Sequence, residues 1–239
     1  AIMKEMTKYC QIIEAGVAFS TSTSDSPIIM EANDRAIKSG MNMTKTLKVI
    51  EEVIKETNND TCFVIMTYLN PIVVYGVKKF IKSSASIGIA GVIIVDNNLN
   101  SPEEKILLNG LSKKGIGYTK IISPTNSEKF IQQSIKNTKN SFIYITTYAG
   151  LTGSKNVNLK NVKKLINKVK KYSKEVPTGV GFGVKTTKHV KQVSKYADAV
   201  ICGSSIVNKI KVGHEKKFSA KKLAKFIGKY VKTLSAGAR

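Results

Sequence analysis

The 239-residue sequence contains no tryptophan, only two histidines and only three cysteines. Neither His189 nor His214 has a cysteine or a second histidine at the spacing of a metal site, so no metal centre is expected. Cys10, Cys62 and Cys202 are scattered and lie in or beside apolar runs. That placement is typical of reduced core thiols in a cytosolic protein, and it fits neither a disulfide framework nor a zinc site.

Long apolar runs are also absent. No stretch of 18 or more apolar residues occurs, so no membrane-spanning segment is predicted. The chain does not open with the charged and then apolar pattern of a secretory signal peptide. We therefore expect a cytoplasmic protein that has no membrane partner.

Arginine is nearly missing although the formal net charge is +23. A strongly basic chain can indicate binding to nucleic acid or to an anionic membrane. Here the only arginines are Arg35 and Arg239, whereas nucleic-acid readers favour arginine for bidentate and stacking contacts. The lysines are spread over almost every expected helix, which favours solvated faces over a specific nucleic-acid site. A lysine-rich nucleic-acid binder is the least favoured interpretation.

Seven short apolar runs are typical of strands that are buried on both faces of a parallel sheet. Amphipathic patterns with helical spacing lie between them, and Ser101-Pro-Glu-Glu104 predicts a capping box at the start of one helix. The predicted strands are Ile12–Phe19, Cys62–Tyr68, Gly91–Asp96, Tyr118–Ser123, Phe142–Thr147, Thr178–Val184 and Ala197–Gly203.

Strict alternation of strands and helices predicts an α/β fold with a parallel sheet. Seven strands are counted, one fewer than the eight that close a (β/α)8 TIM barrel. The chain begins inside an apparent helix, residues 1–9, that leads directly into the first counted strand. We expect a single TIM-barrel domain over residues 1–239 that is truncated at its N-terminus and lacks the first strand. The alternative is an open doubly wound sheet.

Two acids lie in the stretch from Gln11 to Ile29. Glu14 interrupts an apolar run, and Asp25 ends a loop of small residues, just before Ser26 and Pro27 at an expected helix start. An acid inside a strand is costly unless it is paired or has a task. The two acids are a candidate acid/base pair. The alternative is a solvated edge-strand Glu and an ordinary helix-capping Asp.

Glycines end the last two predicted strands, in Gly181-Phe-Gly183 and Gly203-Ser-Ser205, and each group precedes a helix start. Backbone N–H groups at such a place can bind an anion without obstruction from side chains. Barrels often bind phosphate with the loops after their last two strands. The fingerprint G-x-G-x-x-G is absent, so a dinucleotide site is not indicated.

Several stretches along the chain together carry a resemblance to a known family. They are Ile13–Ser20, Asp25–Ala32 with Arg35-Ala36, Met66–Pro71, Ala149–Gly153, Val180–Gly183 and Ala197–Val207. In their order and spacing, over essentially its whole length, the chain resembles the α subunit of tryptophan synthase. The resemblance implies a (β/α)8 barrel that cleaves indole-3-glycerol phosphate to indole and glyceraldehyde 3-phosphate. It also implies a subunit without a cofactor that passes indole to a pyridoxal-phosphate-dependent β subunit in an αββα assembly.

The resemblance also implies roles for single residues. Glu14 would be the acid/base, Asp25 would accept the indole N–H, and Tyr144 would line the active site. Phe182 would pack on the indole, and Thr152 would belong to a lid over Tyr148–Asn158. The phosphate would be held by Gly153, Gly181, Gly183, Gly203 and Ser204.

Some positions depart from the family pattern. The loop Ala18–Ser22 lacks the usual acid and prolines, Ser26 replaces a glycine, and Tyr148 stands where the lid normally has an arginine. Two further alternatives follow. One is a catalytically weakened α subunit kept as a binding partner of the β subunit. The other is a different phosphate-binding barrel isomerase, which the joint presence of Glu14 and Asp25 disfavours.

Overall fold

The computed structural model describes residues 1–57, 60–96, 101–146, 159–181 and 183–238. Within these ranges the chain alternates between strands and helices. The strands are β1 (Ile12–Gly16), β2 (Cys62–Thr67), β3 (Gly91–Ile94), β4 (Gly117–Ile122), β5 (Ile143–Thr146), β6 (Thr178–Gly181) and β7 (Ala199–Val200). The helices are α1 (Ile2–Met6), α2 (Pro27–Lys38), α3 (Met43–Thr57), α4 (Leu69–Tyr75), α5 (Val77–Ser86), α6 (Pro102–Lys113), α7 (Glu128–Asn137), α8 (Leu159–Tyr172), α9 (Thr187–Val193), α10 (Ser204–Glu215) and α11 (Ala220–Ser235).

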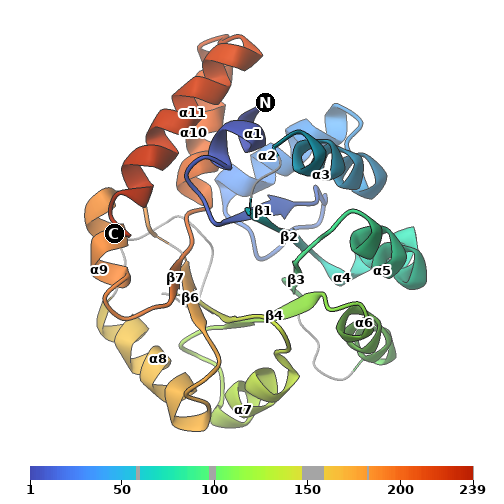
Figure 1. The fold of residues 1–239 in the computed structure, drawn as a ribbon, viewed down its shortest axis with the longest axis vertical. Helices are drawn as coiled ribbons and strands as arrows, with labels where there is room; N and C mark the ends of the chain where they lie inside the picture. Colours follow the sequence, from blue (N-terminus) through green and yellow to red (C-terminus); the bar gives the residue numbers. More distant parts are fainter. Residues whose placement is uncertain (58–59, 97–100, 147–158, 182, 239) are drawn as a thin grey trace.

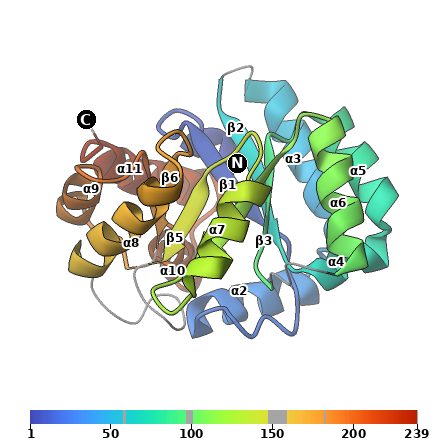
Figure 2. The same ribbon diagram turned by 90° about the horizontal axis from the view of Figure 1, so that it is seen from below.

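The strands form one parallel sheet in which each strand pairs with the next one along the chain, in the order β1 to β7. The sheet curls around a centre and the helices surround it, as Figures 1 and 2 show. This is a TIM-barrel-like α/β arrangement, as predicted. The strictly sequential strand order is incompatible with a doubly wound sheet, because that fold needs a point at which the strand order reverses.

All seven predicted strands are present, but most are shorter than predicted. β1 ends at Gly16 instead of Phe19, and β7 consists of Ala199 and Val200 alone. The first helix is likewise shorter than residues 1–9. The apolar runs continue beyond the strand ends into the loops that follow the strands. Some of the site residues described below lie in these loops.

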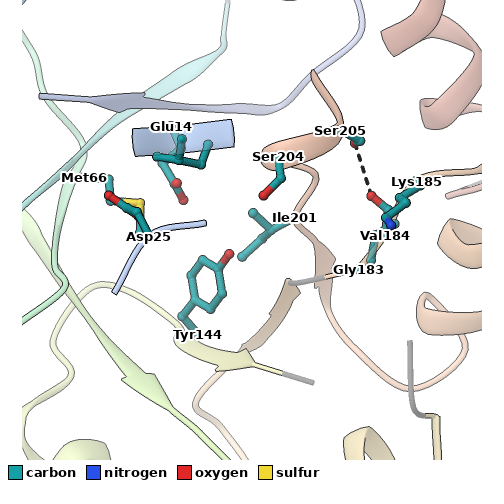
Figure 3. A pocket seen from close by; sticks show the side chains of 12 residues that line it. Glu14, Asp25, Met66, Tyr144, Gly183, Val184, Lys185, Ile201, Ser204 and Ser205 are labelled. Carbon is teal, nitrogen blue, oxygen red and sulfur yellow. Dashed lines mark hydrogen bonds between the residues drawn. The ribbon is translucent and has the colours of Figure 1, made fainter. Parts of the chain in front are cut away.

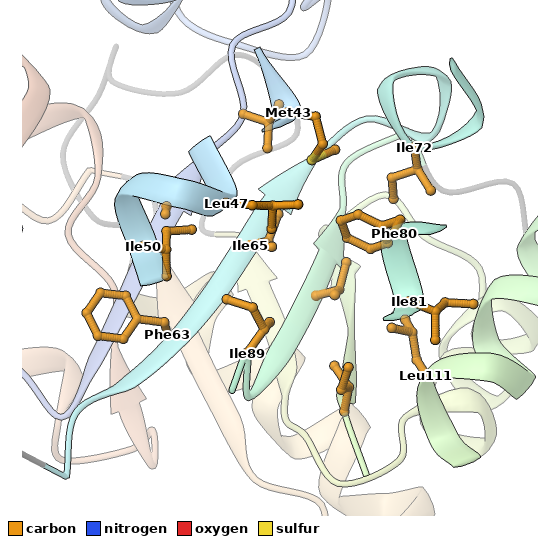
Figure 4. Close-up of a cluster of buried hydrophobic side chains, with 14 of the residues drawn as sticks. Met43, Leu47, Ile50, Phe63, Ile65, Ile72, Phe80, Ile81, Ile89 and Leu111 are labelled. Atoms are coloured by element: carbon orange, nitrogen blue, oxygen red, sulfur yellow. The ribbon is translucent and has the colours of Figure 1, made fainter. Parts of the chain in front are cut away.

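Apolar side chains fill two layers. On the outer layer, residues of the sheet and its covering helices pack together, and Figure 4 shows part of this packing around Leu47, Ile65 and Phe80. Inside the curled sheet lies a smaller cluster built on Val64, Ile93 and Tyr144. Both faces of the strands are therefore covered, which explains their nearly continuous apolar sequences.

β1 and β7 are the two ends of the strand order, and no pairing between them occurs among the described residues. Helices connect the two ends instead. α1 packs on α11, and α2 packs on α10 (Figure 1). An ion pair between Glu31 of α2 and Lys211 of α10, at 2.5 Å, joins the second pair of helices.

The cysteines depart partly from their predicted positions. All three are free, and Cys10 and Cys202 are half-buried. Cys62 is exposed, so its prediction as a core thiol is wrong. It is the first residue of β2. Among the residues described, no helix combines the length and apolar character needed to cross a membrane.

The predicted capping box at α6 is half right. The Ser101 hydroxyl accepts the backbone N–H of Glu104 at 3.1 Å, as a helix cap does. The Glu104 side chain does not return to Ser101. It turns inward, where one carboxylate oxygen accepts the Tyr118 hydroxyl at 2.9 Å and forms an ion pair with Lys120. Glu104, Tyr118 and Lys120 are all fully buried between β4 and α6.

We expect Lys120→Met to lower the free energy of unfolding by about 3–5 kcal/mol, because it leaves the Glu104 carboxylate buried without its counter-charge. Urea unfolding followed by circular dichroism measures the loss. The double variant Lys120→Met, Glu104→Leu should regain most of that stability, because both charges are then gone. A double variant no more stable than the single one would show that the ion pair does not account for the loss.

Candidate active site

One pocket lies at the carboxyl ends of the strands, and residues far apart in the sequence line it (Figure 3). Glu14 comes from β1, Asp25 from the loop before α2, and Tyr144 from β5. The remaining lining residues come from β2, from α2, from the loops after β6 and β7, and from the start of α10. They are Ile29, Met66, Gly183, Val184, Lys185, Ile201, Gly203, Ser204 and Ser205.

Glu14 faces the inside of the sheet. It is in register with Val64 of β2, whose side chain belongs to the inner apolar cluster, whereas Ile13 and Ala15 point to the outer layer. Its side chain has no hydrogen bond or ion pair within the described part of the chain. Burial, together with the negative charge of Asp25, raises the pKa of Glu14 to about 7. The carboxyl group can therefore both give and take a proton near neutral pH.

Asp25 has a different environment. Asn33 donates to it from α2 at 3.4 Å, and the backbone N–H of Asp25 donates to the Ser22 carbonyl at 3.1 Å. Burial raises the pKa of Asp25, and the neighbouring donors Ser22, Asn33 and Tyr68 lower it again in part. Asp25 is thus held as a hydrogen-bond acceptor, whereas Glu14 is held only by apolar neighbours.

Tyr144 lies between Ile121 of β4 and Gly179 of β6 in the sheet. Its hydroxyl lies directly against Gly181, at a distance that no side chain on residue 181 would allow. Burial and the charge of Glu14 raise the pKa of Tyr144 well above 10, so the hydroxyl remains protonated and able to donate. Gly181 makes room for this tyrosine and does not itself line the pocket.

The opposite wall of the pocket is suited to an anion. Gly183 has a φ of +82°, a backbone conformation that side-chain-bearing residues rarely adopt. Gly203 precedes α10, and the N–H groups of Ser204 and Ser205 belong to the first turn of that helix, where intrahelical acceptors are lacking. The Ser205 hydroxyl donates to the Val184 carbonyl at 3.2 Å, which joins the two loops (Figure 3).

The predicted site residues fall into two groups. Glu14, Asp25, Tyr144, Gly183, Gly203 and Ser204 line the same pocket, and Gly181 lies behind Tyr144. Thr152, Gly153, Phe182 and the predicted lid Tyr148–Asn158 lie outside the described residues. Among the residues that are described, no group of three or more His, Cys, Asp or Glu side chains could hold a metal ion.

The sequence did not predict several residues that line the pocket or contact the Asp25 loop. Lys185 lines the pocket next to the anion wall, and it follows Gly183 by only two residues. Tyr68 and Asn33 contact the Asp25 loop without lining the pocket. Tyr68 lies in the stretch Met66–Pro71 that carries the family resemblance, so a signal for it existed. Asn33 had no such signal, because an amide on an amphipathic helix is ordinarily a surface residue.

We expect Glu14 to titrate near pH 7 and Asp25→Asn to lower that pKa, because the substitution removes the charge that opposes ionisation of Glu14. Carboxyl carbon NMR of protein labelled in its glutamate side chains measures the shift, and Glu14→Gln assigns the signal. The matched control is Asp198→Asn, since Asp198 lies outside the pocket and pairs with Lys170. An unchanged Glu14 titration in Asp25→Asn would contradict the proposed coupling of the two acids.

Comparison with known proteins agrees with this geometry. The tryptophan synthase alpha chain of Vesicomyosocius okutanii is 36% identical over 200 residues, which is 82% of this chain and 72% of that protein. A structure of Mycobacterium tuberculosis tryptophan synthase covers 100% of this chain and 85% of its own, with a TM-score of 0.86 and 28% identity. The tryptophan synthase subunit alpha of Legionella pneumophila covers 99% and 85%, with a TM-score of 0.84 and 26% identity.

Residues 1–235 also match the family described as tryptophan synthase alpha chain. The match includes every described residue of the pocket. The chain therefore belongs to the tryptophan synthase alpha chain family, the lyase subunit that cleaves indole-3-glycerol phosphate in tryptophan biosynthesis.

Proposed function

We propose that Glu14 and Asp25 carry out the retro-aldol cleavage of indole-3-glycerol phosphate, with Glu14 as the acid/base and Asp25 as the acceptor for the indole N–H. The observation that carries the proposal is that both acids line one pocket with the glycines and the α10 N-terminus of the anion wall. A substrate with an indole ring at one end and a phosphate at the other needs both features in one place.

The reaction breaks the carbon–carbon bond between the indole ring and its glycerol arm. A proton must be added to the substituted ring carbon, and a proton must leave the neighbouring hydroxyl group as it becomes the aldehyde carbonyl. The electrons of the broken bond remain on the ring and restore indole. Glu14, whose pKa of about 7 lies close to neutral pH, suits both proton transfers.

The assignment of the two acids follows from their surroundings. Protonation of the ring carbon places positive charge on the indole, and an ionised acceptor at the N–H stabilises that charge. The Asn33 amide hydrogen-bonds to Asp25, and the neighbouring Ser22 and Tyr68 hydroxyls also favour its carboxylate, whereas no hydrogen bond to Glu14 occurs within the described residues. Tyr144, a protonated donor close to Glu14, is placed to orient the glycerol arm.

The phosphate is proposed to bind at Gly183, Gly203 and Ser204, where α10 presents its positive dipole end. Lys185 supplies a positive charge at the same wall. We further propose that Gly153 completes this site, that Phe182 packs on the indole, and that Thr152 belongs to the lid. These three rest on the family resemblance. The proposed roles need no group beyond the chain's own residues, in keeping with an alpha chain without a cofactor.

A β subunit is the implied partner of the family, and we propose an αββα assembly in which that subunit brings pyridoxal phosphate. A second hollow supports this proposal. It lies between the loop after β1, the start of α3, and α4. Its lining residues include Val17, Phe19, Met43, Pro71 and Val74. Val74 is 79% exposed, so a large apolar side chain is available there for contact with a partner.

We also propose a single domain over residues 1–239, which the continuous sheet supports, and a cytoplasmic location, which membership of a biosynthetic family supports. The weakened alternative is not favoured, because both acids and the anion wall share the pocket. The barrel-isomerase alternative is not favoured either, because the family is that of the lyase.

We expect Glu14→Gln and Asp25→Asn each to reduce indole release from indole-3-glycerol phosphate by about a hundredfold or more, the usual contribution of a positioned acid or base. Indole is quantified directly in steady-state assays. Glu51→Gln, on the exposed face of α3, is the matched control and should leave the rate unchanged. Undiminished release by the Glu14→Gln protein would remove Glu14 from its proposed role.

We expect Val74→Asp to weaken binding of a tryptophan synthase β subunit by about tenfold or more, because it places a charge in an apolar contact. Isothermal titration calorimetry measures the affinity. Ile106→Asp on α6, another exposed apolar residue, is the control and should bind as the unmodified chain does. If the Val74→Asp protein bound the β subunit as tightly as the Ile106→Asp protein, the partner would bind to a different face.

A further inference from the structure

The loop that carries Asp25 is fixed by side chains from three places in the chain. Ser22 comes from the loop itself, Asn33 from α2, and Tyr68 from the end of β2. Ser22 and Tyr68 are almost fully buried. We call these three residues the Asp25 bracket. None of them is among the residues that line the pocket, so the contacts described here are contacts with the Asp25 loop.

Tyr68 contacts the loop in two ways. Its hydroxyl accepts the backbone N–H of Ser24, the residue before Asp25, at 3.2 Å, and lies close enough to Asp25 to favour the ionised carboxyl group. Its ring packs against Phe19 with the ring centroids 5.2 Å apart. Burial and the charge of Asp25 raise the pKa of Tyr68, so the hydroxyl stays protonated and keeps its role as a donor.

Asn33 contacts the loop from the other side. Its amide donates to the Ser22 hydroxyl at 3.2 Å and to one carboxylate oxygen of Asp25 at 3.4 Å. Because Asn33 sits on a regular helix of 12 residues, its position is set by that helix and not by the loop. Asp25 is therefore held between a strand end and a helix.

The Asp25 bracket gives the Asp25 carboxyl group different surroundings from those of Glu14. Both acids are taken out of bulk water, which favours the neutral form of each. Only Asp25 has donors that favour its carboxylate. A carboxyl group that must accept an N–H has to be ionised and correctly aimed before the substrate arrives.

We infer that Tyr68 and Asn33 are positioning residues of the lyase reaction, which hold Asp25 as an ionised acceptor so that Glu14 is the acid that carries the transferable proton. The inference rests on the proposed function, since it explains how the two acids come to have different tasks. Tyr68 and Asn33 act through Asp25 and do not touch the reacting atoms.

Other charged and titratable groups share the pocket with Asp25. Glu14, Tyr144 and Lys185 line the same pocket from β1, β5 and the loop after β6. From α10, which packs on α2, Ser204 and Ser205 line the pocket and neither is charged. Of these groups, only Lys185 would favour the Asp25 carboxylate by its charge, and it remains in place in the variants below.

The test is a carboxyl carbon NMR titration of protein labelled in its aspartate side chains, with Asp25→Asn assigning the signal. Tyr68→Phe keeps the ring packing on Phe19 and removes the hydroxyl, so the pKa of Asp25 should rise by about one unit. Asn33→Ala should raise it in the same direction. Tyr172→Phe is the matched control, because its hydroxyl bonds Glu128 on the surface, and it should leave Asp25 unchanged.

The same variants should change the pH dependence of indole release. With a higher pKa, Asp25 is protonated over a wider acidic range, so the acidic limb of kcat/KM moves to higher pH. The loss of kcat/KM should be about tenfold greater at the acidic end of the pH profile than at pH 8. An Asp25 titration that is unchanged in both Tyr68→Phe and Asn33→Ala would overturn the inference. Because the titration needs no substrate, failure of the unmodified protein to release indole would instead contradict the proposed function.

Discussion

Two half-buried carboxyl groups in one pocket are the constraint on which the rest of the site depends. The charge of Asp25 raises the cost of ionising Glu14, and partial removal from water raises that cost for both groups. The fold resolves the conflict by giving the two acids unlike surroundings. Glu14 lies beside Val64 on the apolar inner face of the sheet, whereas Asp25 sits in a loop supplied with donors. Glu14 is thereby suited to act as an acid/base, and Asp25 to act as a fixed hydrogen-bond acceptor.

The sheet makes this arrangement possible because all its strands are parallel. Their carboxyl ends meet at one end of the molecule, so loops from distant parts of the chain converge there. The acids come from the N-terminal part of the chain, and Gly183 and Ser204 come from its last part. The α2–α10 contact, which includes the Glu31–Lys211 ion pair, brings these two parts together behind the pocket.

Much of this could be predicted from the sequence. Strands buried on both faces leave continuous apolar runs, and an acid such as Glu14 stands out in one of them. Strand ends were less predictable, because the run Ile12–Phe19 stays apolar after the chain has left the sheet at Gly16. Contacts between elements could not be predicted, because a local sequence pattern does not show which elements pack together. The sequence predicts Glu104 as a capping residue, and only the packing of α6 on β4 brings Lys120 and Tyr118 to its carboxylate.

The structure shows where the departures from the family pattern lie relative to the two acids. Ser26 replaces the usual glycine yet is the N-cap residue of α2, with an extended backbone that a serine adopts without strain. Ser22 of the altered loop still contacts Asp25, because its carbonyl accepts the Asp25 backbone N–H at 3.1 Å. The other end of this loop, at Ala18 and Phe19, lines the hollow where the partner is proposed to bind. The changes thus fall beside the acids and leave the acids themselves in place.

The most direct measurement is a crystal structure of the Glu14→Gln protein with indole-3-glycerol phosphate bound. The account predicts that the indole N–H donates to the Asp25 carboxylate while the phosphate lies against Gly183 and the first turn of α10. A phosphate bound elsewhere, or an indole N–H directed away from Asp25, would contradict it.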